Sequence, residues 1–272
     1  MSIAEALHRV RSALYLPASN ARAIEKARTL PADLVMLDLE DAVKDEDKSA
    51  ARAAAVAAGS GEWRPPLFAI RINGIGAAWH EDDVAALRQA ARLDLVVVPK
   101  VEDAVQAAAL AQRVGKPLVA MIETSAGIYA AREIAAADGV AGLIAGTNDI
   151  AAELRLPEGD RTGLSLALQS ILLAARAAGG VALDGVYNRL DDPDGFAAQC
   201  HDGRALGFDG KTLIHPSQID AANRIFGPSE KEIEDARALI AAQSGGAERF
   251  RGRMIEAMHV REAKRLLSRA GK

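Results

Sequence analysis

The sequence contains a single cysteine, Cys200, among 272 residues. One cysteine cannot form a disulfide within the chain and provides no cluster of thiolates for a metal. We expect it to be a buried, passive thiol. Excess positive charge is also missing, because 33 lysines and arginines stand against 37 aspartates and glutamates and no segment is densely basic. This balance argues against a nucleic-acid-binding protein.

Long apolar runs are missing as well. No stretch of about 18 apolar residues is free of charge, so the sequence predicts no membrane span. The first ten residues, MSIAEALHRV, lack the apolar core and small-residue cleavage site of a secretory signal, and we expect none. Since 50% of the residues are hydrophobic, the chain can build a substantial core. A soluble cytoplasmic protein is the default expectation.

Short apolar segments alternate with amphipathic, alanine-rich ones along most of the chain. Eight apolar segments, each bounded by glycine, proline or aspartate, are typical of buried parallel strands: Ala13–Pro17, Leu34–Leu39, Leu67–Ile72, Leu95–Pro99, Leu118–Ile122, Gly142–Ala145, Val181–Val186 and Lys211–Ile214. Helix-like stretches lie between them, and Asn20 and Asp103 are plausible N-caps. Eight such units in roughly 220 residues predict a (β/α)8 barrel, or TIM barrel. The alternative, a doubly wound open sheet, is weakened because no G-x-G-x-x-G turn follows the first strand.

The alternation ends after residue 216. Three helix-like stretches follow, Ser217–Ile225, Ser229–Gln243 and Glu256–Arg269, and the segment SGGAERFRGR separates the last two. Its glycine pair and charges are typical of a mobile connection. We divide the chain into a barrel domain, residues 1–227, and a C-terminal helical extension, residues 228–272. A barrel does not need this extension, so we expect it to be a lid or a subunit contact.

Polar residues follow most predicted strands at the end where barrels carry their chemistry. They are Asp38, Glu40, Asp41, Arg71, Asn73, Lys100, Glu102, Glu123, Asn148, Asp149, Asp184, Asn188, Lys211 and His215. Because burying a bare carboxylate is costly, the acids of LDLED must face the basic members of this ring. We expect Glu40 or Asp41 to pair with Arg71 and hold its guanidinium in place. The alternative is an ion-pair network that merely closes the barrel mouth.

Two carboxylates, Glu123 and Asp149, follow consecutive strands and have no histidine or cysteine nearby in the sequence. Such a pair suits a hard cation such as Mg²⁺, with water or substrate oxygens completing the coordination. The alternative is that each carboxylate caps the helix that follows it. Gly146, Thr147 and Asn148 form a turn before Asp149, and its backbone N–H groups suit a substrate carboxylate.

Two further residues carry weaker signals. His215 precedes a proline, which favours an extended backbone at the histidine. Lys26 lies on the first helix-like stretch after the first strand. A lone histidine is usually structural and a lone helix lysine is usually solvated, so neither predicts a site by itself.

Taken together, the motifs resemble those of a known family. The segments RSALYLPASN, LDLEDAV, AIRING, VVPKVE, IETSAGI, GTNDI, LDGVYN, GFDGKTLIHPSQI and GRMIEAMHV are similar to the citrate lyase β-subunit and malyl-CoA lyase family of the HpcH/HpaI aldolase superfamily. The resemblance covers nearly the whole chain in the right order. It implies a (β/α)8 barrel that forms a homotrimer or homohexamer. It also implies Mg²⁺ and acyl-CoA thioesters, with CoA as part of the substrate.

The resemblance also implies roles at the strand ends. Glu123 and Asp149 bind Mg²⁺, and Arg71 contacts the substrate carbonyl or the enolate oxygen. Glu40 and Asp41 orient Arg71 and metal-bound water. The implied substrate contacts are Arg71, Glu123, Gly146, Asn148 and Asp149. The positions that match CoA-binding residues are Tyr15, Asn20, Lys26, Ile214 and His215, although malyl-CoA lyases often have arginine where Asn20 stands.

The tail carries one more implied residue. In malyl-CoA lyases a lid residue from a neighbouring subunit, usually aspartate, acts as acid and base, and the matching residue is Glu256 in GRMIEA. Glutamate keeps the carboxylate and adds a methylene, and a shift of about 1 Å matters for proton transfer. This substitution places the sequence nearer the branch that includes (3S)-malyl-CoA thioesterases.

The sequence therefore predicts an enzyme, with one leading reaction and two alternatives. The leading hypothesis is a carbon–carbon lyase that cleaves malyl-CoA, citramalyl-CoA or citryl-CoA to acetyl-CoA and an oxo acid. The alternatives are a thioesterase acting on the same substrates and an aldolase acting on 2-oxo acids without CoA. A non-enzymatic barrel is disfavoured because Arg71, Glu123 and Asp149 are all present.

Overall fold

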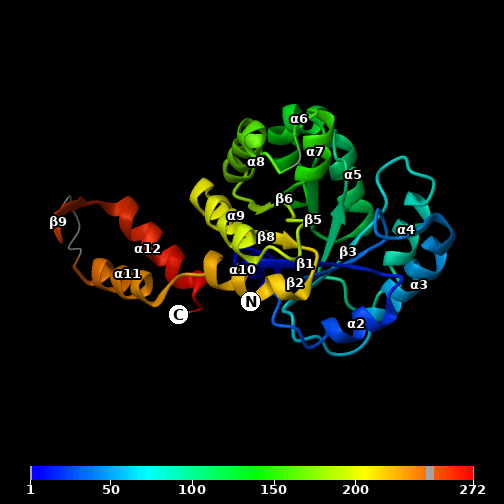
Figure 1. Cartoon of the computed structure of the whole chain (residues 1–272), viewed down its shortest axis with the longest axis horizontal. Helices are drawn as coiled ribbons and strands as arrows, with labels where there is room; N and C mark the ends of the chain where they lie inside the picture. The colour runs from blue at the N-terminus through cyan, green and yellow to red at the C-terminus, as the bar shows by residue number, and fades with distance from the viewer. Residues whose placement is uncertain (1, 158, 243–247, 272) are drawn as a thin grey trace.

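A closed barrel of eight parallel strands forms the centre of the molecule (Figure 1). The computed structural model describes residues 2–157, 159–242 and 248–271. Each strand pairs with the next, and β8 pairs with β1. The strands are β1 (Ser12–Pro17), β2 (Leu34–Asp38), β3 (Leu67–Arg71), β4 (Leu95–Val98), β5 (Leu118–Ile122), β6 (Val140–Ala145), β7 (Val181–Asp184) and β8 (Gly210–Leu213). The predicted (β/α)8 barrel is confirmed.

Helices surround the barrel. They are α1 (Ile3–Leu7), α2 (Ala21–Ala27), α3 (Lys48–Ala58), α4 (His80–Leu87), α5 (Ala104–Val114), α6 (Ser125–Ala135), α7 (Thr147–Glu153), α8 (Ser165–Ala177), α9 (Pro193–Leu206) and α10 (Ile219–Phe226), with short 3₁₀ turns η1 (Asp45–Asp47), η2 (Thr162–Leu164) and η3 (Pro216–Gln218). The expected N-caps are confirmed, because Asn20 accepts the N–H of Ala23 and Asp103 accepts that of Gln106. Nowhere in the described ranges is a helix both long and apolar enough to cross a membrane.

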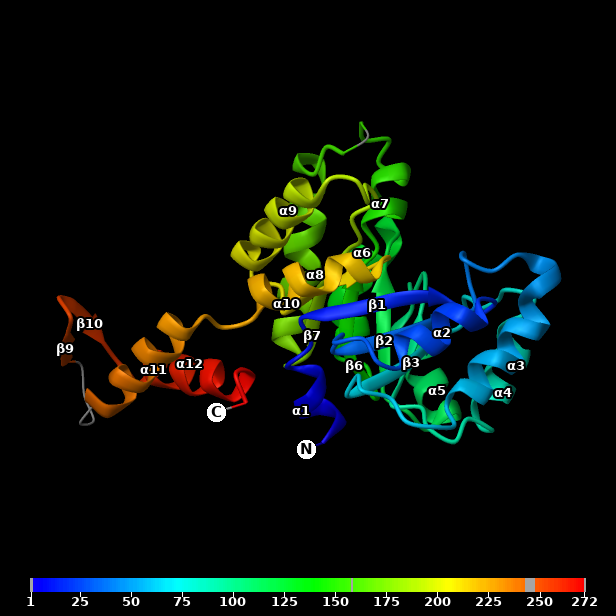
Figure 2. The ribbon, with the colours of Figure 1, turned by 60° about the horizontal axis from the view of Figure 1, so that its bottom comes forward.

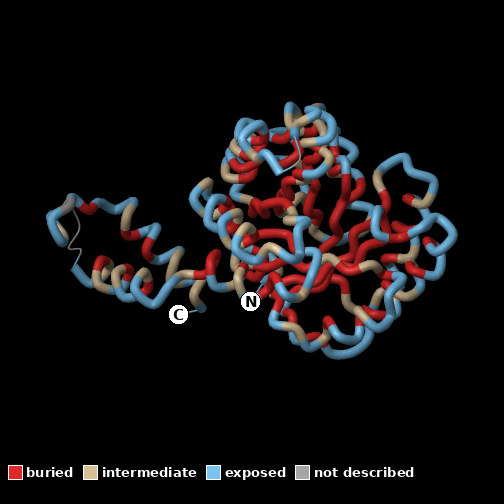
Figure 3. The backbone as a smooth tube through the Cα atoms, in the orientation of Figure 1, coloured by how far each residue is buried: buried red, intermediate tan, exposed pale blue. Residues whose placement is uncertain are grey.

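The core has an inner and an outer layer, because side chains alternate along each strand. Inward residues fill the barrel, and Leu7 and Val10 close its lower end. Outward residues pack beneath the helices, and Figure 3 shows the strands of the barrel as mostly buried. The inward layer includes Leu34, Met36, Leu67, Ala69, Val119 and Met121. The next inward positions on β2, β3 and β5 are Asp38, Arg71 and Glu123, so alternation itself delivers charged groups to the barrel mouth.

An arm follows the barrel and projects away from it in both views of the ribbon (Figures 1 and 2). It contains α11 (Glu230–Ala242), an antiparallel hairpin of β9 (Glu248–Phe250) and β10 (Arg253–Ile255), and α12 (Ala257–Arg269). A small apolar cluster, including Leu239, Ile255 and Val260, joins the two helices. The expected helices are present, whereas the hairpin was not anticipated. Of the connection expected to be mobile, residues 244–247 lie outside the described residues. The proposed division at residue 227 falls between α10 and α11.

Candidate active site at the barrel mouth

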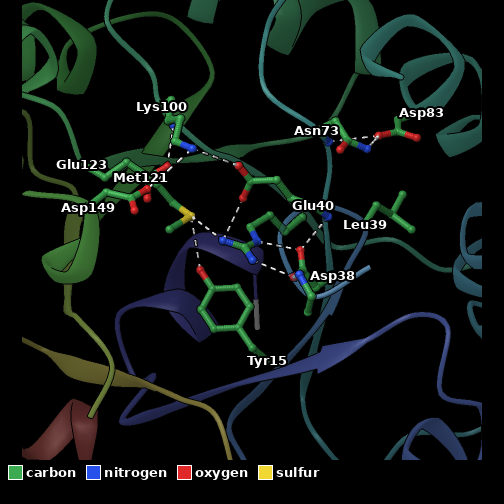
Figure 4. A network of polar contacts seen from close by, with 12 residues as sticks. Tyr15, Asp38, Leu39, Glu40, Asn73, Asp83, Lys100, Met121, Glu123 and Asp149 are labelled. Carbon is green, nitrogen blue, oxygen red and sulfur yellow. Dashed lines mark hydrogen bonds and ion pairs between the residues drawn. The ribbon is translucent and has the colours of Figure 1, made fainter. Parts of the chain in front are cut away.

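Arg71 is the last residue of β3, at the barrel mouth, and its partners Tyr15, Asp38 and Glu40 are labelled in Figure 4. Its Nε and Nη2 atoms donate to the two carboxylate oxygens of Asp38, each at 2.6 Å. Nη1 lies 2.9 Å from Oε2 of Glu40, and the guanidinium lies over the Tyr15 ring at 4.8 Å from its centroid. A bidentate carboxylate and an aromatic face fix the plane of the guanidinium. Arg71 is therefore held rigidly with little freedom to rotate.

The acids of β2 and its following loop have different surroundings. Glu40 pairs with Arg71 as expected, whereas Asp41 is exposed and forms no ion pair with any residue that the structure describes. Asp38 is the main partner of Arg71, which the sequence reasoning missed. Its carboxylate also accepts the N–H groups of Glu40 and Ala42, at 2.9 and 3.0 Å. Asp38 thus holds both Arg71 and the turn that carries Glu40.

The buried side chain of Lys48 holds the turn that carries Glu40. Lys48 donates from Nζ to the backbone oxygens of Leu39 and Glu40, at 2.8 and 2.7 Å, and to Oδ1 of Asn73 at 2.8 Å. The amide of Asn73 in turn donates to Asp83 at 2.6 Å. No motif in the sequence marked Lys48 or Asp83, because their partners are backbone oxygens and a residue far along the chain. This network fixes the position of Glu40 independently of Arg71.

Glu123 and Asp149 lie across the mouth from Glu40. Glu123 follows β5 and is 4% exposed, and its Oε1 accepts the N–H of Lys100 at 2.8 Å. Asp149 lies in the first turn of α7, and its side chain is 41% exposed. The Lys100 Nζ lies 3.6 Å from Oδ2 of Asp149 and 3.8 Å from Oε1 of Glu40. Two carboxylates therefore lie within ion-pair distance of the Lys100 ammonium, and Glu123 lies beside them, bound to the backbone N–H of the same lysine (Figure 4).

The alternative that Glu123 caps a helix does not hold. Thr124 is the N-cap of α6, and its Oγ1 accepts the N–H of Gly127 at 3.0 Å. The carboxylate of Glu153 accepts the N–H of Ser125 at 2.8 Å. The orphan N–H groups of this helix thus have other partners, and the Glu123 carboxylate remains available at the mouth.

The turn before Asp149 is shaped by Glu123. Gly146 is the N-cap of α7, and a Cβ at this position would stand 2.2 Å from Cβ and 2.5 Å from Oε2 of Glu123. Only glycine fits there without displacing Glu123. Asn148 is exposed and exchanges hydrogen bonds with Asn188, at 2.9 and 3.4 Å. The structure thus brings Gly146 and Asn148 to the same region as the carboxylate pair.

The site is short of positive charge. Burial raises the pKa of Glu40 to about 7 against the opposing effect of Arg71, and the carboxylates of Asp41 and Glu123 add to the rise. Burial likewise raises the pKa of Glu123 to about 7, the Lys100 N–H opposes this rise, and the Asp149 carboxylate adds to it. The described residues contain no group of three or more histidine, cysteine or acidic side chains in a metal-binding arrangement. Glu123 and Asp149 nonetheless provide hard oxygen donors with excess negative charge, which suit a divalent cation completed by water or substrate.

These pKa values predict a pH dependence of stability in metal-free protein. The free energy of unfolding is expected to fall as pH rises from about 5 to about 8, because the folded state binds protons on Glu40 and Glu123 more tightly than the unfolded state. Glu40→Gln should flatten this slope, since the amide does not titrate. Urea unfolding in EDTA at several pH values measures the free energy of unfolding of wild type and of Glu40→Gln. If this free energy changed with pH equally in both proteins, the raised pKa of Glu40 would be contradicted.

The positions expected to bind CoA separate into two groups. Asn20, Lys26, Ile214 and His215 are exposed, and they follow β1 and β8, which are neighbouring strands. Tyr15 instead points into the barrel, and its hydroxyl lies 3.3 Å from Sδ of Met121. Burial raises the pKa of its phenol. The structure therefore places Tyr15 with Arg71 and apart from the four exposed positions.

Lys211 and Asp184 do not belong to the ring at the mouth, so the expectation that placed them there was wrong. Its Nζ donates to Asp184 at 2.9 Å, and Arg161 donates to the other Asp184 oxygen at 2.7 Å. Lys211 and Asp184 are fully buried on the outer side of the barrel, next to Gly203 of α9. Leu213 belongs to the outer layer, and alternation places Lys211 on the same side.

Cys200 is buried on α9, as expected of a passive thiol. Burial raises its pKa to about 12, so the thiol stays protonated and unreactive at neutral pH.

Glu256 is exposed on the arm, at the N-cap position of α12. Its backbone N–H donates to Nδ1 of His259 at 3.0 Å. The junction of β10 and α12 lies away from the barrel in both views (Figures 1 and 2). Within one chain, the structure does not bring Glu256 to Arg71.

Fold and site together define a (β/α)8 barrel whose polar groups converge at the carboxyl ends of its strands. Residues 11–216 match the model of the HpcH/HpaI aldolase/citrate lyase family, and residues 167–272 match that of C–C bond lyases of the TIM-barrel fold. The chain belongs to the HpcH/HpaI aldolase/citrate lyase family.

Three known proteins illustrate this membership. A (3S)-malyl-CoA thioesterase of Cereibacter sphaeroides is 41% identical, over 98% of this chain and 97% of that protein. A citrate lyase subunit beta-like protein of Deinococcus radiodurans is 38% identical, over 95% and 96%. The structure of the protein CitE of Mycobacterium tuberculosis, in complex with magnesium, acetoacetate and coenzyme A, superposes with a TM-score of 0.81. It is 35% identical and covers 96% of this chain and 98% of that chain.

Proposed function

We propose that this protein is a Mg²⁺-dependent carbon–carbon lyase that cleaves a 3-hydroxyacyl-CoA to acetyl-CoA and an oxo acid. The observation that carries the proposal is the rigidly held Arg71 facing the Glu123 and Asp149 pair across the barrel mouth. When a base takes the hydroxyl proton of a hydroxyacyl-CoA and its carbon–carbon bond breaks, negative charge develops first on the hydroxyl oxygen, which becomes a carbonyl, and then on the oxygen of the acetyl-CoA enolate. Arg71 supplies positive charge for one of these oxygen atoms. The Glu123 and Asp149 pair offers a site for a cation beside the other.

Glu123 and Asp149 would hold the magnesium ion. When bound, the ion supplies positive charge that polarises substrate oxygen atoms. The structure of CitE with magnesium, acetoacetate and coenzyme A supports this assignment, since its ligands combine the same chemical classes. The exposed positions Asn20, Lys26 and His215 lie on neighbouring segments and are proposed to contact the CoA portion.

Arg71 is proposed to stabilise the enolate oxygen of the departing acetyl-CoA. A guanidinium whose plane is fixed before the reaction needs no reorganisation when the oxyanion forms. Asp38, Glu40 and the Tyr15 ring provide that fixation. Glu256 is proposed to return a proton to the enolate carbon from a neighbouring subunit's arm, because its own arm points away from its own barrel. The assembly would then be a homotrimer or homohexamer.

A thioesterase acting on the same substrate is the second candidate. The 41% identity to a (3S)-malyl-CoA thioesterase favours it, and so does a glutamate where malyl-CoA lyases usually have aspartate. The barrel mouth serves either reaction, because both place an oxyanion near Arg71. The two reactions differ in whether the carbon–carbon bond or the thioester bond breaks.

One incubation separates the candidates. Malyl-CoA, citramalyl-CoA and citryl-CoA are each incubated with the protein and Mg²⁺, and the products are identified by mass spectrometry. A lyase yields acetyl-CoA and an oxo acid, which is glyoxylate in the case of malyl-CoA. A thioesterase yields free CoA and the intact hydroxy acid. Failure to turn over any CoA ester, with turnover of free 2-oxo acids, would refute both.

Glu256→Ala is expected to lower turnover by about 10²–10⁴-fold, the range of a lost general acid, with little change in melting temperature. Glu256 is exposed and packs against no core, so replacing it should cost no more stability than the loss of a helix cap. Glu256→Asp should raise the ratio of lyase to thioesterase products if side-chain length sets the outcome. Product ratios at saturating substrate measure this effect. Glu262→Ala on the same helix, also exposed, is the matched control.

Mixed oligomers test whether the arm serves a neighbour. Inactive Arg71→Ala subunits are mixed with inactive Glu256→Ala subunits under conditions of verified subunit exchange. Partial recovery of activity is expected, because some sites then combine an intact barrel with an intact arm. Absence of recovery would show that the arm acts on its own barrel or takes no part.

A further inference from the structure

We propose that Lys100 is a built-in counter-ion for the carboxylate cluster, which supports the cluster without metal and weakens its affinity for a divalent cation. The inference rests on the proposed function, in which Glu123 and Asp149 hold that cation. It assigns to Lys100 a control over metal affinity that is separate from any contact with substrate.

The contacts of Lys100 place its charge among the acids of the site. The ammonium lies 3.6 Å from Asp149 and 3.8 Å from Glu40, distances of ion pairs rather than of hydrogen bonds. The ammonium is held by these ion pairs. Because the Lys100 side chain is 48% exposed, the ammonium also has room to move outward into solvent. Glu40 lies on one side of it and Glu123 and Asp149 on the other (Figure 4).

The backbone of Lys100 points to a functional placement. Its φ of +50° is left-handed, a region that residues with a Cβ seldom adopt. The backbone N–H of the same residue holds Oε1 of Glu123 at 2.8 Å. Glycine or asparagine would adopt this conformation more readily, so backbone geometry does not explain why a lysine stands there. Such strain is typical of functional sites.

Electrostatics fixes the direction of the effect. A lysine side chain carries a positive charge at neutral pH, and the ammonium of Lys100 lies within 4 Å of the Glu40 and Asp149 carboxylates. A divalent cation and this ammonium would be attracted by the same carboxylates and would repel each other. A counter-ion therefore makes metal binding weaker when present and stronger when removed. A lysine that merely oriented the ligands would have the opposite effect on affinity.

Lys100→Met tests the inference, because methionine removes the charge and keeps a long side chain on the same strained backbone. Calorimetric titration with MgCl₂ alone, without substrate, is expected to show about tenfold tighter binding than in wild type. The difference in Mg²⁺ affinity between Lys100→Met and wild type should become smaller at high ionic strength, where exposed charges are screened. In EDTA the melting temperature should fall below that of wild type, since the carboxylates have lost their counter-ion. Lys100→Arg should stay near wild type in all three measurements.

Lys44→Met is the matched control. Lys44 is exposed on the loop that follows β2, and its loss changes the net charge equally without touching the cluster. Unchanged or weaker Mg²⁺ binding by Lys100→Met, with wild type binding normally, would overturn the inference and leave the proposed function intact. A wild type that binds no Mg²⁺ would overturn the proposed metal pair itself, and the inference with it.

Discussion

Arg71→Lys is expected to lower kcat by roughly a hundredfold or more, although the substitution keeps the positive charge. Arg71 donates to both oxygens of Asp38 while a third nitrogen faces Glu40. An ammonium has no planar fork and cannot reproduce these directions together with a contact to an oxyanion. Loss of one preorganised oxyanion donor costs about 10²–10³ in kcat. KM should change much less, since the lost contact strengthens only as the oxyanion forms.

A matched substitution separates catalysis from folding. Arg176→Lys alters an arginine that also pairs with a carboxylate, Asp209, at 2.7 Å, but does so outside the barrel mouth. It should leave kcat within a few-fold of wild type. Circular dichroism and melting temperature report on the fold of both variants. If Arg71→Lys also stays within a few-fold, Arg71 is only a structural partner of Asp38 and Glu40.

The barrel could be predicted because its signal is local. Each strand is a short apolar run with turn residues at its ends, and the period of two along a strand also places Arg71 and Glu123 on its inner side. The same alternation could have identified Asp38 as the partner of Arg71, two residues after the inward Met36. It could also have excluded Lys211, two residues before the outward Leu213. A position at a strand end therefore predicts a place in the site only together with the face of the strand on which the residue lies.

Other features depend on contacts between distant parts of the chain. Lys48 donates to backbone oxygens and to Asn73, partners that carry no sequence signal. The short helices α1 and α7 have five and seven residues, too few for a helical period to appear. The three-residue strands β9 and β10 lie beside glycines that suggested only a loop. A contact between the arm and the barrel of another subunit would depend on how subunits assemble, so the sequence and structure of one chain leave it as a proposal.

Glu123→Gln is expected to weaken Mg²⁺ binding by roughly a hundredfold or more, because one of only two carboxylate ligands loses its charge. The glutamine oxygen can still accept the Lys100 N–H, so the turn after β4 should keep its shape. Metal-free protein should be as stable as wild type or more stable at neutral pH, since a buried carboxyl with a raised pKa has been replaced by a neutral amide. Activity should fall in parallel with metal occupancy.

The melting temperature and the activity of the same samples test this loss of Mg²⁺ binding. In wild type, Mg²⁺ should raise the melting temperature by mass action, and in Glu123→Gln that rise should largely disappear. Glu153→Gln is the matched control, because Glu153 is an exposed carboxylate that accepts the Ser125 N–H nearby. It should retain the Mg²⁺-dependent rise. Full activity of wild type in excess EDTA would show that the reaction needs no metal, and Glu123 would then act through its carboxyl group alone.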